Sequence, residues 1–332
     1  MEKGDDSILG YELEYFDPIP NVVRTLWMKY RTEDGTIELR EEDKIFLKRI
    51  KYEEIRIEDL FAGNTISIYG KLMIIKSYCN SFTVKFMKSR EVHILCRITQ
   101  LQIDSMVQVL RIARNYNLRM GRVKMSPSDG ILASAHTITI DLVGLNGESS
   151  KQFVHDTALS SLDSFHCEVV DGDALAKVWE AKSRLTVPRH SSLCIIKPHI
   201  LRSLQTDAIM EDILRAGFTI EAVVTIHFSP SMASELFEGY KDAVPKYADL
   251  VAQIVSAPSL ALMVTGFGAD TVRRFREFCG PYVPEVAKTL RPKTLRATYG
   301  IDPTQNAVHC TDIDELGEIE CKYVFQTIAG LD

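Results

Sequence analysis

The chain has 332 residues, of which 45% are hydrophobic and 25% charged, the usual balance of a soluble globular protein with two or three domains. Its net charge of -6 argues against a general nucleic-acid binder, and because no apolar run approaches ~18 residues, neither a membrane span nor a membrane partner is expected. The polar, acidic N-terminus is unlike a signal peptide, and seven scattered cysteines without a C-x-x-C motif argue against a disulfide framework or a metal site, so reduced cysteines in a cytosolic compartment are expected.

The first part of the chain is predicted to form a small, mostly-β domain over residues 1–90. Tyr11, Leu13 and Tyr15 alternate with other residues, as in a strand with one buried face, and Asp34-Gly35 is a strong hairpin signal. Further strand-like stretches follow, at residues 23–30, 37–39, 46–50, 65–69 and 72–77. This pattern ends near Phe86.

Residues 91–183 have a different character and are predicted to alternate strands and helices. Apolar runs predict strands at 92–98, 118–125 and 136–143. Helical spacing predicts helices at 104–116 and 174–181.

Residues 184–332 repeat this order on a larger scale. Strands are predicted at 192–196, 218–226 and 259–264, with a short strand before His309. Helices are predicted at 207–216 (ended by Gly217), 231–240, 247–254, 270–278 and 314–325, with a long loop over 280–294. Thr311 and Asp314 have the spacing of a capping box. This β-α-β-β-α-β order predicts an α+β, ferredoxin-like sandwich.

The second and third regions also look like two copies of one domain. Residues 95–100 resemble residues 193–198, and Phe165-His166-Cys167 resembles Val308-His309-Cys310. The first copy is much shorter between its strands, where loops and inserted helices usually carry binding sites. We therefore expect the first copy to retain the scaffold and to lack the pocket.

Phosphate chemistry is the best interpretation of the residues around His309. We expect this histidine to lie just before a helix, whose N-terminus favours anions. Lys197 ends a buried strand, and Arg276 and Arg296 could add positive charge for a polyphosphate. Glu320, about three helical turns further on, could hold the other imidazole nitrogen. Spacing alone leaves a purely structural role for each of these residues open.

Ordered motifs over residues 191–325 resemble the nucleoside diphosphate kinase family. They are Ile196-Lys197-Pro198, Arg215-Ala216-Gly217-Phe218, the segment 290–296 and Asn306-Ala307-Val308-His309. The resemblance implies ping-pong transfer of a γ-phosphate from a nucleoside triphosphate to a nucleoside diphosphate, with Mg²⁺ bridging the phosphates.

The resemblance also implies site roles. The catalytic set is His309 as nucleophile, Lys197, and Glu320 as the residue that orients the histidine. The nucleotide-binding set is Lys197, Phe237, Tyr247, Arg276, Arg296 and Asn306, with Tyr247 within one residue of the base-stacking aromatic. No metal ligand from the protein is implied.

Several positions depart from the family pattern. Cys310 and Thr311 replace the glycine and serine that follow the histidine, His199 replaces an aspartate, and the bulky Tyr282 falls where a phosphate-binding threonine is expected. In the first copy the equivalent positions hold Thr99, Gln100, Asp163 and Lys177 around His166. We expect His166 to be inactive, and the departures around His309 leave activity there open.

Residues 10–86 resemble the DM-ten domain, a PH-like β module of ciliary proteins, through the segments 46–49, 58–64 and 68–70. This domain followed by two kinase-like copies is typical of an axoneme-associated branch of the kinase family. The resemblance leaves two functions open. One is a structural microtubule inner protein of the ciliary or flagellar doublet, located in the cytoskeleton of the axoneme and bound to tubulin and other axonemal proteins, with residual phosphotransfer left open. The other is an active nucleoside diphosphate kinase that binds nucleoside di- and triphosphates.

Overall fold

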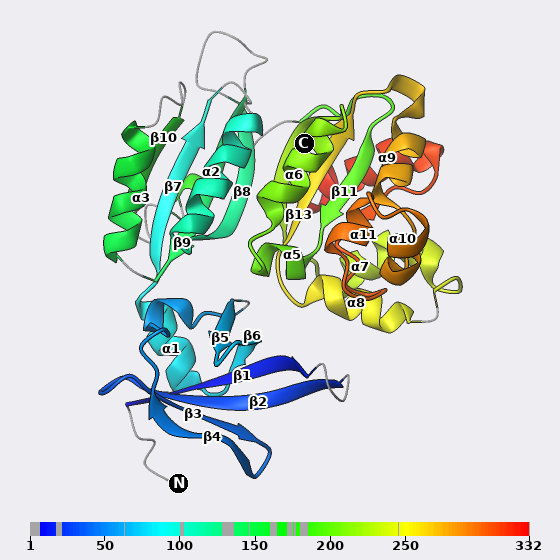
Figure 1. Cartoon of the computed structure of the whole chain (residues 1–332). Coiled ribbons are helices and arrows are strands. Elements are labelled where there is room, and N and C mark those ends of the chain that lie inside the picture. Colours follow the sequence, from blue (N-terminus) through cyan, green and yellow to red (C-terminus); the bar gives the residue numbers. More distant parts are fainter. Residues whose placement is uncertain are drawn as a thin grey trace. The chain divides into compact units, whose positions relative to one another are not determined.

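The computed structural model describes residues 7–17, 22–62, 64–99, 103–127, 136–145, 147–159, 165–170, 175, 177–179, 185–244 and 246–331. The chain divides into two compact units: Met1–Val92 with Gly144–Ser149, and His93–Val143 with Ser150–Asp332. Each unit is described separately below (Figure 1). The division into domains at 1–90, 91–183 and 184–332 remains a prediction.

The first unit is built on a six-stranded antiparallel sheet in the order β4-β3-β2-β1-β6-β5. Its elements are β1 (Ile8–Asp17), β2 (Val22–Arg31), β3 (Thr36–Glu41), β4 (Lys44–Lys51), η1 (Ile57–Asp59), β5 (Thr65–Ile68), β6 (Lys71–Tyr78) and α1 (Ser81–Ser89). The expected alternation is confirmed, since Tyr11, Leu13 and Tyr15 are all buried on one face of β1.

Helix α1 was not expected from the sequence. It begins after Asn80, whose side chain accepts a hydrogen bond from the Thr83 amide at 2.7 Å. Contacts with β1 hold it in place: Gly10 N–H donates to Thr83 Oγ1 at 2.9 Å, and the Tyr11 hydroxyl lies 3.4 Å from Met87 Sδ. A nine-residue helix stabilised by tertiary contacts leaves little periodicity in the sequence.

In the second unit, a four-stranded sheet has the order β10-β7-β9-β8. Its elements are β7 (Val92–Ile98), α2 (Ile103–Asn115), β8 (Arg119–Pro127), β9 (His136–Gly144), α3 (Gly147–Leu159) and β10 (Phe165–Val170). The three expected strands and the first expected helix are present, whereas α3 and β10 were not foreseen. Of the helix expected at 174–181, the described residues 175 and 177–179 are helical.

A second four-stranded sheet has the order β12-β13-β11-β14. Its strands are β11 (Ser192–Ile196), β12 (Thr219–Ile226), β13 (Ser259–Thr265) and β14 (Val308–Cys310). The α-helices are α5 (Pro198–Arg202), α6 (Thr206–Arg215), α7 (Pro230–Leu236), α8 (Tyr247–Val255), α9 (Thr271–Cys279), α10 (Pro284–Leu290), α11 (Leu295–Tyr299) and α12 (Gly317–Cys321). Shorter helical segments are η2 (Glu238–Tyr240), η3 (Gly268–Asp270), η4 (Asp314–Leu316) and the π-helical η5 (Lys322–Ile328).

Both sheets place their strands in the same spatial order, with the fourth strand beside the first and the third between the first and the second. This is the β-α-β-β-α-β arrangement expected from the strand and helix order. The sheets also meet within the second unit, where Val123 N–H of β8 donates to Thr225 Oγ1 of β12 at 2.9 Å. On the neighbouring helices, Arg114 of α2 pairs with Asp207 of α6 at 3.3 Å.

The prediction of a loop over residues 280–294 was wrong in part. Helix α10 occupies seven of these residues, and α11 begins at Leu295, the residue after this segment. Both are short, and proline and glycine residues lie around them, so the sequence carries no helical period there. The helix expected over 314–325 is broken into η4, α12 and η5.

Candidate active site

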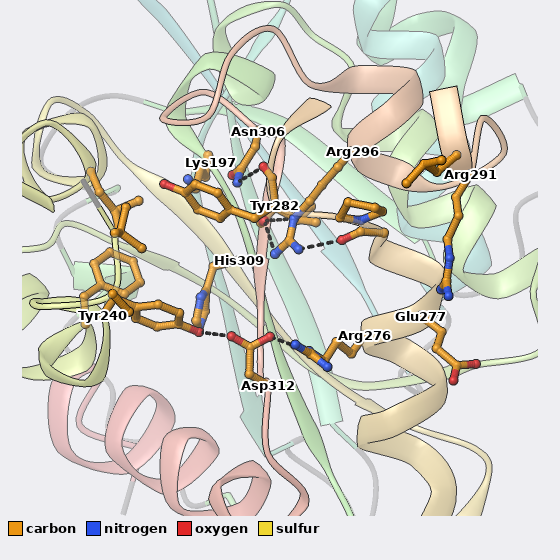
Figure 2. A pocket seen from close by; sticks show the side chains of 18 residues that line it. Lys197, Tyr240, Arg276, Glu277, Tyr282, Arg291, Arg296, Asn306, His309 and Asp312 are labelled. Atoms are coloured by element: carbon orange, nitrogen blue, oxygen red, sulfur yellow. Dashed lines mark hydrogen bonds and ion pairs between the residues drawn. The ribbon is translucent and has the colours of Figure 1, made fainter. Parts of the chain in front are cut away.

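A cavity of about 640 Å³ opens beside β14 in the C-terminal part of the chain. It is lined by residues from the end of β11, the α7–η2 turn, α8, α9, the segment 280–296 and residues 306–312. Figure 2 shows Lys197, Arg276 and Arg296 arranged around His309. The cavity therefore gathers positive charge next to an imidazole.

His309 lies in the middle of β14, opposite Ile195 of β11. The expectation that it immediately precedes a helix was wrong, because the next helical residue is Asp314. Its side chain is 6% exposed, and the rings of Phe237 and Tyr240 meet it edge-on at centroid distances of 5.2 and 6.0 Å. Strand pairing and two aromatic rings, rather than a helix dipole, hold this imidazole.

Glu320 lies behind the histidine, with its Oε2 3.7 Å from His309 Nε2. The Thr311 hydroxyl donates to the same Glu320 oxygen at 2.7 Å and accepts from the Leu193 amide at 3.0 Å. The predicted capping box at Thr311 was therefore wrong, since this hydroxyl is used between strands and the N-cap residue of η4 is Ile313. Thr311 thus fixes the carboxylate that faces the histidine.

Two buried cations form the inner wall of the cavity. Lys197 is 1% exposed, and its ammonium donates to the Thr304 carbonyl at 2.8 Å. Burial, reinforced by the Arg296 charge, lowers the pKa of Lys197 to about 7. Arg296 is 7% exposed and donates to the carbonyls of Gly280 at 2.8 Å and Val308 at 3.2 Å.

Arg276 is held by a residue that the sequence did not single out. Its Nε donates to Asp312 Oδ1 at 2.8 Å, and the Tyr240 hydroxyl donates to Asp312 Oδ2 at 2.5 Å. Burial alone would raise the pKa of Asp312, but the hydrogen bonds from Tyr240 and Arg276 outweigh it and hold that pKa below its usual value. The only sequence signals were spacings of three residues, from Phe237 to Tyr240 and from His309 to Asp312.

Asn306 and Tyr282 complete the wall above the histidine (Figure 2). Asn306 Nδ2 donates to the Tyr282 carbonyl at 2.9 Å. Within the described part of the chain, the buried Asn306 Oδ1 and Tyr282 hydroxyl have no hydrogen-bond partner. Polar atoms left unpaired in a cationic cavity favour a polar ligand.

Comparison with known proteins agrees with this geometry. A model of the nucleoside diphosphate kinase family matches residues 190–329. The nucleoside diphosphate kinase of Aquifex aeolicus (strain VF5) is 30% identical over 134 residues, which cover 40% of this chain and 92% of that protein. The chain belongs to the nucleoside diphosphate kinase family. It is an α+β protein with the nucleoside diphosphate kinase fold in its C-terminal part and a β-rich sheet at its N-terminal end.

The similarity to one group within the nucleoside diphosphate kinase family extends over almost the whole chain. Nucleoside diphosphate kinase homolog 7 of Rattus norvegicus is 26% identical over 376 residues, covering 98% of this chain and 95% of that protein. A crystal structure of the Aquifex aeolicus nucleoside diphosphate kinase aligns with a TM-score of 0.39 at 29% identity, over 41% of this chain and 94% of that one.

The structure gathers most of the residues that the kinase family resemblance assigns to the site. The cavity is lined by Lys197, Phe237, Arg276, Arg296, Asn306 and His309. Glu320 reaches His309 from behind. Tyr247 does not line the cavity: its hydroxyl donates to the Ser234 carbonyl at 3.2 Å, and Leu250 is the residue of α8 at the cavity wall. Base stacking by Tyr247 therefore stays a prediction.

The first copy differs from this kinase-family site at the corresponding positions. His166 is exposed on β10, whereas His309 is buried. Thr99, at the position of the buried Lys197, is also exposed, as is Lys177. Asp163 and Gln100 lie outside the described residues.

A metal ion bound directly by the protein would need carboxylate ligands in the cavity of the nucleoside diphosphate kinase site. The carboxylates that line this cavity are Asp312, which Tyr240 and Arg276 occupy, and Glu277. No group of three or more histidine, cysteine, aspartate or glutamate residues suited to a metal occurs in the described part of the chain.

Over the same residues, no helix combines the length and apolar character needed to cross a bilayer.

Proposed function

We propose that the C-terminal domain binds nucleoside di- and triphosphates and transfers the γ-phosphate through His309. The observation that supports this proposal best is the position of His309, with Nε2 facing Glu320 and the ring lining a cavity that also holds Lys197, Arg276 and Arg296. A histidine needs a fixed tautomer to act as a nucleophile, and a carboxylate opposite one nitrogen supplies it.

In this mechanism Glu320 accepts a hydrogen bond from the Nε2–H of His309, so that the proton stays on Nε2 and the lone pair of Nδ1 is free for attack. The present separation of 3.7 Å is longer than a hydrogen bond, and we expect it to shorten when phosphate binds. Nδ1 attacks the γ-phosphorus, the bond to the β–γ bridging oxygen breaks, and the nucleoside diphosphate leaves. A terminal oxygen of a second nucleoside diphosphate then attacks the phosphohistidine and restores the imidazole.

The cations neutralise the phosphates during both steps. Lys197 and Arg276 can turn donors towards phosphate oxygens, and Arg296 retains one N–H beyond those given to Gly280, Val308 and Cys310. The unpaired Asn306 Oδ1 can accept a hydrogen bond from a sugar hydroxyl. Phosphoryl transfer of this kind depends mainly on positioning and charge.

Magnesium would arrive on the nucleotide. Because Asp312 is already occupied, the donors of the cavity fit the phosphate better than the cation, so we assign no protein ligand to Mg²⁺. A bound Mg²⁺ would reduce the charge of the phosphates that Lys197, Arg276 and Arg296 hold.

The test is phosphate transfer by the full chain. Purified protein is incubated with Mg²⁺ and γ-labelled ATP, and acid-labile, base-stable label is measured together with transfer to a nucleoside diphosphate. We expect His309→Ala to lose the label and His166→Ala to retain it. Label that survives in His309→Ala, or no label on the unmutated folded protein, would overturn the proposal.

We propose as a second function that the chain is a structural microtubule inner protein of the axonemal doublet, contacting tubulin and neighbouring axonemal proteins. In this proposal residues 1–90 are a PH-like DM-ten domain and residues 91–183 a truncated kinase-like domain. The exposure of His166 and Thr99 supports it, because the first copy keeps the sheet without a buried phosphate site.

This second function is separable from catalysis. Full-length His309→Ala protein is expressed in ciliated cells, and its retention in isolated doublet microtubules is measured after high-salt washing. We expect retention equal to that of the unmutated protein. Quantitative release of both proteins by salt would contradict a luminal, structural role.

We also propose that the tandem copies pair with each other instead of forming the hexamer of single-domain kinases. The contacts Val123–Thr225 and Arg114–Asp207 support this. A hexamer on a sizing column would contradict it.

A further inference from the structure

The two sheets of the second unit carry a cysteine pair at equivalent positions. Cys96 of β7 lies opposite Cys167 of β10, and Cys194 of β11 lies opposite Cys310 of β14. In each case the pair joins the first and fourth strands, next to the histidine of that copy. The duplicated arrangement places two thiols face to face twice in one chain.

Opposed positions on antiparallel strands suit a disulfide. Directly paired residues have Cα atoms about 4.5 or 5.5 Å apart, depending on the hydrogen-bonding pattern. Both values fall within the range of about 4.4–6.8 Å seen across disulfides. Their side chains also point to the same face of the sheet, so Cys96 and Cys167 need no change of register to bond.

The two pairs differ in access. Cys194 and Cys310 are both completely buried, and Cys310 Sγ also lies 3.6 Å from Arg296 Nη2. Cys96 is buried too, but Cys167 is partly exposed. A reagent in solution can therefore reach the first pair through Cys167, whereas the second pair is sealed.

The surroundings of Cys167 also favour its thiolate, which is the reactive form. Its sulfur lies 3.0 Å from the Thr157 hydroxyl of α3. Hydrogen bonding from Cys96, and then from Thr157, lowers the pKa of Cys167 to about 7. The exposed Cys79 favours its neutral thiol instead, since desolvation by neighbouring atoms raises its pKa.

We propose that Cys96 and Cys167 form a reversible disulfide by exchange with a small disulfide such as oxidised glutathione. The Cys167 thiolate attacks one sulfur of glutathione disulfide, forming a mixed disulfide and releasing one glutathione thiolate. Cys96 then loses its proton and attacks the Cys167 sulfur, which releases the second glutathione. The two cysteines are oxidised and the glutathione disulfide is reduced to two thiols.

The cross-link would tie the first and last strands of this sheet together. It closes a loop from β7 to β10, and such closure restricts the unfolded chain. Oxidation is therefore expected to stabilise the first sheet, with no chemical change at the cavity around His309.

The test uses the full chain in buffers with different ratios of reduced to oxidised glutathione, quenched with acid and alkylated. Tryptic digestion places Cys96 in residues 91–97, Cys167 in residues 152–177 and Cys79 in residues 77–85. We expect a linked 91–97/152–177 peptide that disappears with dithiothreitol, while Cys194 and Cys310 are alkylated only after unfolding.

Two variants distinguish this disulfide from simple glutathionylation. In the unmutated protein, oxidation should raise the unfolding temperature by several degrees. Cys167→Ser changes a partly exposed side chain and should lose both this rise and the linked peptide. Cys79→Ser is the matched control and should retain both. A stable glutathione adduct on Cys167 with Cys96 still free, or a linkage from Cys194 to Cys310 in the folded protein, would overturn the proposal.

Discussion

The Tyr240 hydroxyl donates to Asp312 at 2.5 Å, and the second oxygen of the same carboxylate accepts from Arg276 at 2.8 Å. One carboxylate therefore connects the aromatic wall of the His309 cavity to an arginine on α9. Arg276 is 58% exposed in its side chain, so this contact, rather than burial, sets its direction.

Asp312→Asn should release Arg276 from its orientation. Because transfer depends on the placement of charge, we expect kcat/KM to fall about tenfold, equal to about 1.4 kcal/mol. Tyr240→Phe leaves the Arg276–Asp312 pair in place and should lower it less than about threefold. An equal loss in both variants would contradict this prediction, because the site would then depend on Tyr240 as much as on Asp312. Steady-state phosphotransfer assays give both values.

Thr311→Val should affect both stability and catalysis. The substitution removes the hydroxyl that donates to Glu320 and leaves the buried Leu193 amide without its acceptor, at a cost of about 2 kcal/mol. We also expect slower labelling of His309, because Glu320 is no longer held. Thr311→Ser keeps the hydroxyl and is the matched control. The prediction fails if valine and serine give equal unfolding midpoints and equal labelling rates.

Nucleotide binding should take up a proton at Lys197. The pKa of this lysine in the free protein is lowered to about 7, so at pH 8 the amine is mostly neutral. Phosphate favours the charged ammonium and raises that pKa, so binding captures a proton and affinity falls as pH rises from 7 to 9, by at most about tenfold per pH unit.

Calorimetric titration with a nucleoside diphosphate, in buffers of different ionisation enthalpy, measures this proton. Lys197→Arg keeps a fixed charge and should abolish the uptake even where binding weakens. Equal proton uptake by the lysine and arginine proteins at pH 8 would assign the titration to another group.

Arg114→Met should destabilise the second unit by about 2 kcal/mol at pH 7, because it removes the ion-pair partner of the Asp207 carboxylate, which is 3% exposed. Burial raises the pKa of Asp207, and Arg114 opposes that rise. A raised folded pKa means that protonation favours the folded state. The difference between variant and parent should therefore shrink as pH falls from 7 towards 4.

Arg111→Met on the same helix is the matched control. Its partner Glu211 is more exposed and also pairs with Arg215, so we expect a change below about 0.5 kcal/mol. Urea unfolding at both pH values tests the pair. A loss for Arg114→Met that does not change with pH would show that the pKa of Asp207 is not involved.

The sequence alone was sufficient for the elements with strong local patterns. Alternation identified β1, and apolar runs identified β7, β9, β11 and β13. Helical spacing identified α2, α6 and α9, and Gly217 marked the end of α6 with its positive φ of 86°. Such elements can be predicted because the periodicity of their apolar residues is visible in the amino-acid sequence.

The short elements did not follow from the sequence, because tertiary contacts stabilise them. α1 is held by Thr83 and Met87 against β1, and α10 and α11 are too short to show a helical period. The same reason explains why the predicted capping box at Thr311 was wrong. The Thr311 hydroxyl bonds to the distant Leu193 amide and Glu320 carboxylate instead of capping the next helix.

By itself, the sequence was sufficient to predict the candidate residues of a phosphate site: His309, Lys197, Arg276, Arg296 and the distant Glu320. Only the tertiary structure decided how they are held. β14 pairs with β11 and thereby places His309 between Phe237, Tyr240 and Glu320, and Asp312 enters the site through partners 36 and 72 positions away in the chain. Residue type and spacing determine local chemistry and local structure, whereas contacts between distant segments arise only when the sheet forms and the core closes around it.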